Sequence, residues 1–188
     1  MKIIKTEIPE VVIIEPKVFG DERGYFMETF SDEIFKKEVI NTTFVQDNES
    51  KSKYGVLRGL HYQLPPYAQS KLVRVLQGKV LDVAVDIRKG SPTFLKHVAV
   101  ELSEENKRQF FIPRGFAHGF VVLTETAVFA YKVDNKYSPE NEASIMYNSK
   151  ELGINWLINK NDILLSEKDS KLPSVKDATL FNYNTKLY

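Results

Sequence analysis

Short apolar runs separated by turn signals dominate the middle of the chain, and their spacing predicts strands rather than helices. The run 79–88 carries three valines and an isoleucine, and the sequence Lys89-Gly90-Ser91-Pro92 after it is typical of a turn. Such runs recur at intervals of roughly 8–12 residues, which is typical of all-β sandwiches and barrels. We therefore expect strands at 56–63, 71–77, 79–88, 94–102, 108–112, 116–123 and 126–133.

Two segments have helical character instead. Ser31-Asp32 can cap a helix over 33–40, and the apolar residues expected on one face of that helix are Ile34, Phe35 and Val39. The polar segment 161–175 has scattered apolar residues and is expected to form short helical turns. No linker or repeat interrupts the chain, so we expect one domain over 1–188 in which residues 170–188 form a packing tail.

Composition removes several classes of function. The chain has 188 residues, a formal charge of +1, three histidines and no cysteine. Without cysteine there can be no disulfide framework, thiol nucleophile, Cys-ligated zinc or iron–sulfur cluster. The near-neutral balance argues against a nucleic-acid partner. Charges among the first ten residues and the lack of an 18-residue apolar run predict neither a signal peptide nor a membrane span, so we expect a cytoplasmic protein.

Lys71 and His61 are the first candidates for chemistry. Alternate residues of a strand share a face, so Lys71 lies with Val73 and Val75, and in a small barrel that face is the interior. A buried lysine needs a carboxylate, a phosphate or a catalytic task, whereas a solvated surface lysine is the alternative. His61 is either a general base, because imidazoles titrate close to neutral pH, or a structural histidine.

A second motif, Pro113-x-Gly115-x-x-His118, resembles the second cupin motif, whose histidine binds a metal in metal-dependent cupins. The first cupin motif supplies a His-x-His pair and a glutamate. Here that position reads His61-Tyr62-Gln63, without the second histidine or the glutamate. Two imidazoles without a carboxylate make a poor metal site, so we predict a metal-free cupin. The alternative for His118 is a barrel-core histidine that bonds a backbone group.

Several motifs follow one another along the chain in an order that is specific to one protein family. They are GDERGYFME (20–28), FVQDN (44–48), RGLHYQ (58–63), KLVRV (71–75), GKVLDVAVDIR (78–88) and IPRGFAHGF (112–120). The ordered set, from about Ile3 to Asp169, resembles the dTDP-4-dehydrorhamnose 3,5-epimerase family. The resemblance implies a cupin-type jelly-roll β-barrel with a few short helices. It also implies 3,5-epimerisation of dTDP-4-dehydro-6-deoxy-D-glucose to dTDP-4-dehydro-L-rhamnose, in dTDP-L-rhamnose biosynthesis.

The resemblance also implies catalytic roles. His61 matches the family's base and Asp169 the carboxylate that holds it. Lys71 matches the cation that stabilises the C4 enolate, and Tyr131 the acid on the opposite face. Both inverted carbons lie α to the C4 ketone, so a base, an acid and a cation suffice and no cofactor is expected.

Binding roles follow from the same match. Arg23 and Arg58 are candidates for diphosphate and sugar contacts, and Phe26 and Tyr137 for stacking on the thymine. Further matched binding positions are Glu28, Gln46, Asp47, Asn48, His118, Glu142 and Lys168. In the family the N-terminal strands cross to a partner subunit, which implies a homodimer in which Arg23, Phe26 and Glu28 act in the partner's site.

The sequence does not determine whether C3, C5 or both carbons are inverted. Relatives of the same fold epimerise only C3 or only C5, and others are 3,4-ketoisomerases. A metal-dependent cupin and a non-catalytic nucleotide-sugar-binding module are more distant alternatives. The final deoxysugar product and any assembly beyond a dimer do not follow from the sequence.

Overall fold

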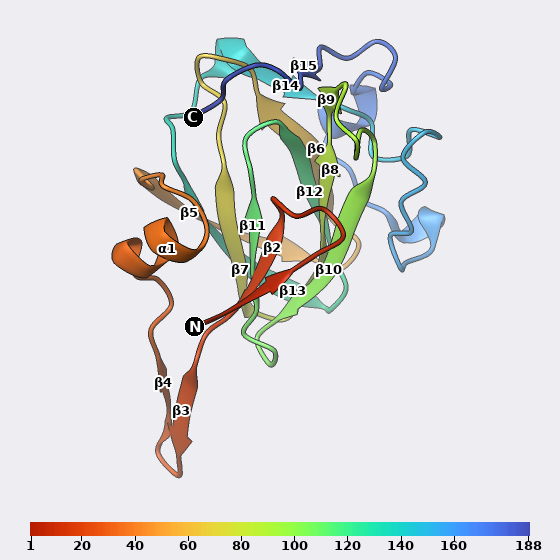
Figure 1. The fold of residues 1–188 in the computed structure, drawn as a ribbon. Coiled ribbons are helices and arrows are strands. Elements are labelled where there is room, and N and C mark those ends of the chain that lie inside the picture. Colours follow the sequence, from red (N-terminus) through yellow and green to blue (C-terminus); the bar gives the residue numbers. More distant parts are fainter.

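Two antiparallel sheets face each other in a computed structural model that describes residues 1–188 (Figure 1). The larger sheet has the order β1-β2-β11-β7-β13-β5, and these strands span Lys2–Lys5, Val12–Glu15, Gln109–Ile112, Lys71–Gln77, Thr126–Val133 and Gln46–Lys53. The smaller sheet has the order β10-β8-β12-β6-β14, with strands His97–Ser103, Lys79–Asp86, Phe116–Val122, Leu57–Gln63 and Glu142–Ser144. The fold is the all-β cupin-type barrel that the sequence predicts.

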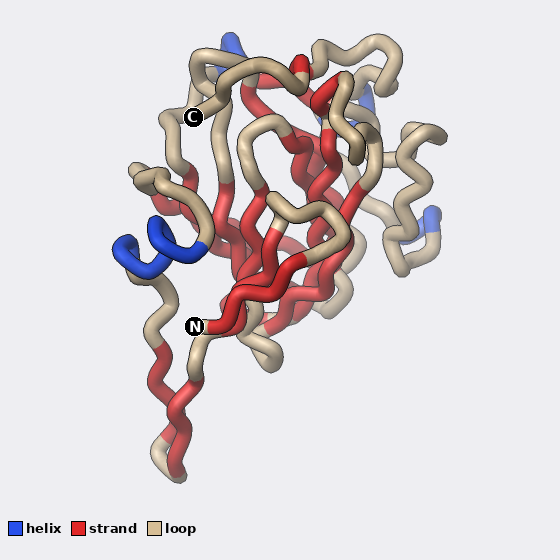
Figure 2. Tube along the Cα trace, viewed as in Figure 1, coloured by secondary structure: helices blue, strands red, loops and turns tan.

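The remaining elements are small. A hairpin of β3 (Val18–Asp21) and β4 (Gly24–Met27) projects from the body, and we call residues 18–28 the arm (Figure 1). Helical structure is confined to α1 (Asp32–Glu38) and three short 3₁₀ turns at Pro139–Asn141, Lys160–Asp162 and Asp169–Lys171 (Figure 2). A parallel pair joins β9 (Arg88–Lys89) to β15 (Phe181–Asn182) in the tail. None of these helices is long and apolar enough to cross a membrane.

The core between the sheets follows from side-chain alternation. Val73 and Val75 of β7 pack against Val80 and Ala84 of β8 and Phe129 of β13 in one buried cluster. Lys71 therefore lies on the interior face of β7, as the alternation predicts. The opposite face of β7 is covered as well, because α1 seats Phe35 there in a separate cluster.

Most of the predicted strands are confirmed, with shifted ends. The strand predicted at 94–102 begins only at His97, since a turn that places Leu95 at a φ of 63° precedes it. Hydrophobic alternation did not predict β5, because Gln46–Lys53 contains no apolar residue. It is an edge strand, held by backbone pairing along all of β13.

The helix is confirmed with one correction. The side chain of Ser31 accepts a hydrogen bond from the backbone N–H of Ile34 and caps α1 as predicted. Ile34 was expected on the packed face, and this prediction was wrong, because the residue is 37% exposed. Only Phe35 is fully buried, and Val39 is partly buried beside it. The short helical turns predicted within 161–175 are present.

Replacing Phe35 with alanine tests how α1 is attached. The Phe35 ring lies 5.1 Å from that of Phe44 and 5.3 Å from that of Phe111, centroid to centroid, so its removal leaves a cavity. We expect Phe35→Ala to lower the free energy of unfolding by about 3–5 kcal/mol in urea titrations. Ile34→Ala is the matched control and should cost less than about 1 kcal/mol. An equal loss of unfolding free energy in both variants would contradict the burial of Phe35 and the exposure of Ile34.

Candidate active site

A cavity opens between the two sheets. It consists of an inner part of about 210 Å³ and an outer part of about 360 Å³, which share His61, Lys71 and Tyr131 in their walls. The structure thus brings Tyr131 together with His61 and Lys71, which come much earlier in the chain. Arg58, His118 and Asp169 line the inner part, and the predicted residues of the outer part are Gln46, Asn48, Tyr137 and Glu142.

One wall belongs to the smaller sheet and carries two histidines. His61 of β6 and His118 of β12 are direct cross-strand partners. The two strands approach closely beside them: Gly59 has a φ of +131°, and a Cβ there would lie 2.6 Å from Gly119 Cα. A side chain on Gly59 would push the strands apart. Glycine at this position therefore allows the two imidazoles to lie side by side.

The His61 imidazole is held by Asp169. Its Nε2 lies 2.7 Å from Asp169 Oδ1, and the other oxygen of that carboxylate accepts a hydrogen bond from the Ser166 hydroxyl at 2.8 Å. Burial acts to raise the pKa of Asp169, but the contacts with His61 and Ser166 outweigh it and the pKa is lowered. Asp169 is therefore a carboxylate at neutral pH. The remaining nitrogen of His61, Nδ1, has no hydrogen-bond partner and is free to take a proton.

The second histidine forms its own pair with a carboxylate. His118 Nε2 lies 2.9 and 3.0 Å from the two oxygens of Asp82, which is fully buried. Burial lowers the pKa of His118. The partner of His118 is thus a carboxylate, and not the backbone group that the alternative prediction gave as its partner. The sequence did not lead us to predict Asp82 as a site residue. Strand alternation could have indicated it, because Asp82 shares the inward face of β8 with Val80, just as Lys71 shares the inward face of β7 with valines.

The opposite wall belongs to the larger sheet and carries Lys71 and Tyr131. Burial lowers the pKa of Lys71 to about 8, although the negative charges of Asp82 and Glu142 act to raise it. Burial raises the pKa of Tyr131, against the opposing effect of the Arg58 charge. At neutral pH this wall therefore presents a cation and a phenol that keeps its proton. Both face the His61 wall across the cavity.

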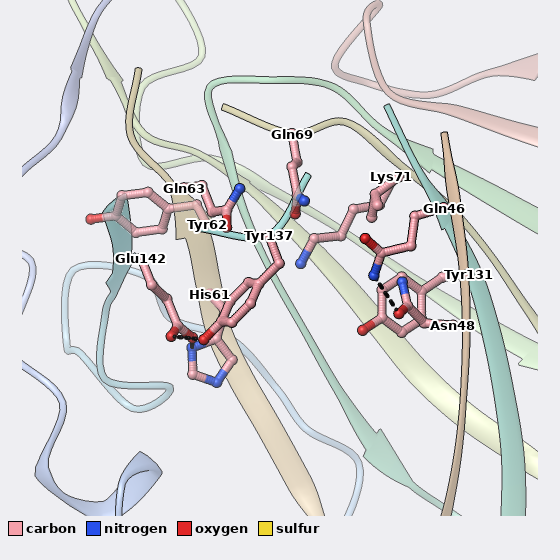
Figure 3. A pocket seen from close by; sticks show the side chains of 11 residues that line it. Gln46, Asn48, His61, Tyr62, Gln63, Gln69, Lys71, Tyr131, Tyr137 and Glu142 are labelled. Atoms are coloured by element: carbon pink, nitrogen blue, oxygen red, sulfur yellow. Dashed lines mark hydrogen bonds and ion pairs between the residues drawn. The ribbon is translucent and has the colours of Figure 1, made fainter. Parts of the chain in front are cut away.

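Glu142 organises the outer part of the cavity (Figure 3). It accepts a hydrogen bond from the Tyr137 hydroxyl at 2.8 Å and pairs with Lys168 Nζ at 2.6 Å. Its second oxygen lies 3.8 Å from His61 Nδ1. The hydrogen bonds that Glu142 accepts, together with the charge of Lys168, lower its pKa despite burial, so it is ionised. Further lining residues that the sequence analysis did not single out are Tyr62, Gln63 and Gln69.

Asp47 and the arm residues lie away from the cavity of their own chain. Asp47 faces the other side of β5 from Gln46 and Asn48, and it pairs with Lys132 at 2.8 Å. The Arg23 side chain is 86% exposed and Phe26 is 70% exposed on the projecting arm. Glu28, at the base of the arm, is exposed too. No group of three or more His, Cys, Asp or Glu side chains is placed to hold a metal ion.

Known proteins resemble this chain along nearly its whole length. The family model of dTDP-4-dehydrorhamnose 3,5-epimerase matches residues 5–177. A dTDP-4-dehydrorhamnose 3,5-epimerase of Shigella flexneri is 58% identical over 182 residues, which cover 96% of this chain and 99% of that protein.

Solved structures give the same result. A dTDP-6-deoxy-D-glucose-3,5-epimerase of Legionella pneumophila, in complex with dTDP-4-keto-L-rhamnose, superposes with a TM-score of 0.94 at 51% identity and covers 98% of this chain and 99% of that one. A 3'-monoepimerase of Streptomyces bikiniensis, in complex with dTDP-quinovose, superposes with a TM-score of 0.84 at 32% identity and covers 92% of this chain and 87% of that one. By sequence and by structure, the chain belongs to the dTDP-4-dehydrorhamnose 3,5-epimerase family.

Proposed function

We propose that this protein inverts C3 and C5 of dTDP-4-dehydro-6-deoxy-D-glucose and releases dTDP-4-dehydro-L-rhamnose. One observation carries the proposal: the His61–Asp169 pair lies on one wall of the cavity, while Lys71 and Tyr131 lie on the other. Inversion of a carbon requires a proton to leave from one face and another to arrive at the opposite face. The two walls supply these two groups.

Each inversion proceeds through an enolate. His61 Nδ1 takes the proton from the carbon next to the C4 ketone, and the C–H electron pair moves into the ring as the carbonyl π electrons shift to the C4 oxygen. The Lys71 ammonium stabilises the resulting oxyanion. Tyr131 then gives its phenolic proton to the opposite face of the carbon as the enolate collapses to the ketone. Asp169 stabilises the imidazolium meanwhile.

The reaction then repeats at the second carbon. The Tyr131 phenolate regains a proton from solvent and His61 releases one, so the overall change is an isomerisation that needs no redox partner. This chemistry requires no cofactor, because the ketone itself acidifies both C–H bonds.

The outer part of the cavity is proposed to hold the nucleotide. Tyr137 offers a flat face for stacking on the thymine, and its hydroxyl is fixed by Glu142. Lys168 provides positive charge for the diphosphate, and so does Arg58, which lines the adjoining inner part and donates to the Ser52 hydroxyl at 3.2 Å. Gln46 and Asn48 are joined by a hydrogen bond of 2.8 Å and present amides to the same space.

A homodimer is proposed to complete each site. The arm presents Phe19, Tyr25 and Phe26 to solvent and does not cover the cavity of its own chain. Exposed aromatic residues of this kind are typical of surfaces that a partner covers. In the proposed dimer the arm carries Arg23, Phe26 and Glu28 to the cavity of the partner subunit.

Hydrogen exchange with solvent tests the reaction. In D2O the enzyme is expected to place deuterium at both C3 and C5 of the ketosugar, as read by NMR and mass spectrometry. His61→Asn should lower the exchange by at least about 10²-fold, because the base is lost. Its Kd for dTDP should stay within about threefold of the wild type, since the variant keeps the fold.

The other outcomes separate the alternatives. Exchange at a single carbon would replace the proposal with a monofunctional epimerase. Binding without exchange at either carbon would indicate a nucleotide-sugar-binding module, and activity that depends on a stoichiometric metal would indicate a metal-dependent cupin. A His61→Asn variant that fails to fold would make His61 a structural residue.

The pH dependence tests the role of Lys71. Its pKa of about 8 means that the ammonium is present below this pH and is lost above it. We expect kcat/KM, which reports on the free enzyme, to fall as pH rises through about 8. Lys71→Arg keeps its charge at high pH, so its residual activity should lack this alkaline limb. An unchanged limb in Lys71→Arg would contradict the assignment.

Subunit mixing tests whether the arm acts in the partner's site. One protomer carries Arg23→Ala with Phe26→Ala, and the other carries His61→Asn, so each homodimer is expected to be inactive. In the mixed dimer the intact arm of the His61→Asn protomer completes the intact cavity of the other. Co-expressed mixed dimers should recover about half of the wild-type activity per dimer. Failure to recover activity in isolated mixed dimers would place the arm in its own chain's site.

A further inference from the structure

A buried carboxylate joins the ends of the two strands that carry Lys71 and Tyr131. The Asp134 side chain is 0% exposed and directly follows β13. It accepts hydrogen bonds from the backbone N–H of Ser70 at 2.7 Å, the Thr42 hydroxyl at 2.9 Å and Arg114 Nε at 3.1 Å. The Ser70 hydroxyl is a further donor to it. Four donors on one buried carboxylate make a rigid junction.

This junction continues the pairing of the strands at their ends. Val133 is the last residue of β13 and is the cross-strand partner of Lys71, the first residue of β7. Beyond this pair the Asp134 N–H donates to the Ser70 carbonyl at 3.4 Å, a long hydrogen bond, and strand ends open easily. The N–H and the hydroxyl of Ser70 also donate to the Asp134 carboxylate and hold the backbone immediately before Lys71. The position of the Lys71 ammonium in the cavity therefore depends on Asp134.

Arg114 supplies the positive charge that a buried carboxylate needs, and the tail holds Arg114. Its Nη1 donates to the Leu187 carbonyl at 2.6 Å, and its backbone N–H donates to the Tyr188 hydroxyl at 2.9 Å. Its guanidinium carbon also lies 4.9 Å from the centre of the Tyr188 ring. Tyr188 is 43% exposed as a whole, and partial burial raises the pKa of its hydroxyl. The tail is thus connected through Arg114 and Asp134 to Ser70 and Lys71.

We propose that Leu187 and Tyr188 are positioning residues for the epimerisation. They fix Arg114, and Arg114 in turn fixes Asp134 and the start of β7. The inference rests on the proposed function, because its consequence is the placement of the cation that stabilises the enolate. A displacement of about 1 Å at such a group can cost about 10²-fold in rate. The tail, for which the sequence predicted a packing role alone, acquires a role in the reaction.

The same tail contains a matched control. Tyr183 packs on Arg88, with 5.2 Å between the guanidinium carbon and the ring centre, and Arg88 pairs with the buried Asp86 at 2.8 Å. This is again a tyrosine on an arginine that pairs with a buried aspartate. However, neither residue flanking Asp86 lines the cavity. Loss of Tyr183 should therefore affect stability without moving the Lys71 ammonium.

The experiment compares Tyr188→Ala, Tyr188→Phe and Tyr183→Ala in the 188-residue chain, with Asp134→Asn as a fourth variant. We expect Tyr188→Ala to lower kcat about tenfold with KM within about twofold of the wild type, because only the catalytic placement changes. Tyr188→Phe keeps the ring on Arg114 and should fall between Tyr188→Ala and the wild type. Tyr183→Ala should keep its kcat, and Asp134→Asn should lose more activity than Tyr188→Ala.

The controls keep the result decisive. The Tm of each variant and its affinity for dTDP are measured beside the kinetics, so that unfolding is separated from misplacement. A Tyr188→Ala variant with wild-type kcat would overturn the inference. So would a loss of activity that matches its loss of folded protein, or an equal loss in Tyr183→Ala. Failure of the wild-type enzyme to exchange C3 and C5 in the same assay would instead refute the proposed function.

Discussion

An ammonium group placed between two sheets is costly, and much of this structure can be understood from how the cost of burying Lys71 is met. An unpaired buried charge costs several kcal/mol, and burial lowers the pKa of Lys71, to about 8 with its charged neighbours present. The charges of Asp82 and Glu142 act in the opposite direction and keep the ammonium charged at neutral pH. Asp82 also bonds His118, and Glu142 also accepts a hydrogen bond from Tyr137. The same two carboxylates therefore determine both the charge balance and the geometry of the site.

The barrel separates the two halves of the chemistry. His61 and His118 are cross-strand partners on the smaller sheet, whereas Lys71 and Tyr131 lie on adjacent strands of the larger one. In the proposed reaction a proton acceptor and a proton donor therefore approach the sugar ring from opposite sheets. Rigid strands hold such groups more accurately than loops do. The outer part also draws mainly on strands, to which Gln69 and Tyr137 are added from connecting segments. In the proposed dimer the arm of the partner subunit completes it.

Local patterns in the sequence predicted an all-β sandwich or barrel and, for a barrel, the inward direction of Lys71, since strand alternation is a local property. The choice of a cupin-type barrel followed from the family resemblance. The strand β5 was missed because its eight residues carry no apolar side chain and its pairing with β13 depends on distant residues. Asp82 was visible in the alternation of β8 but was not singled out. Asp134 could not be found in this way, because the donors to its carboxylate come from Thr42, Ser70 and Arg114, far away in the chain.

The central claim is that protons leave toward one wall and arrive from the other. It is tested most directly with a substrate deuterated at C5 and converted in a single turnover in H2O. The account predicts that the inverted product carries only solvent hydrogen at C5 and that the deuterium appears in water. Deuterium found at C5 of the inverted product would show that one group carries the hydrogen from face to face, and would contradict the division of roles between His61 and Tyr131.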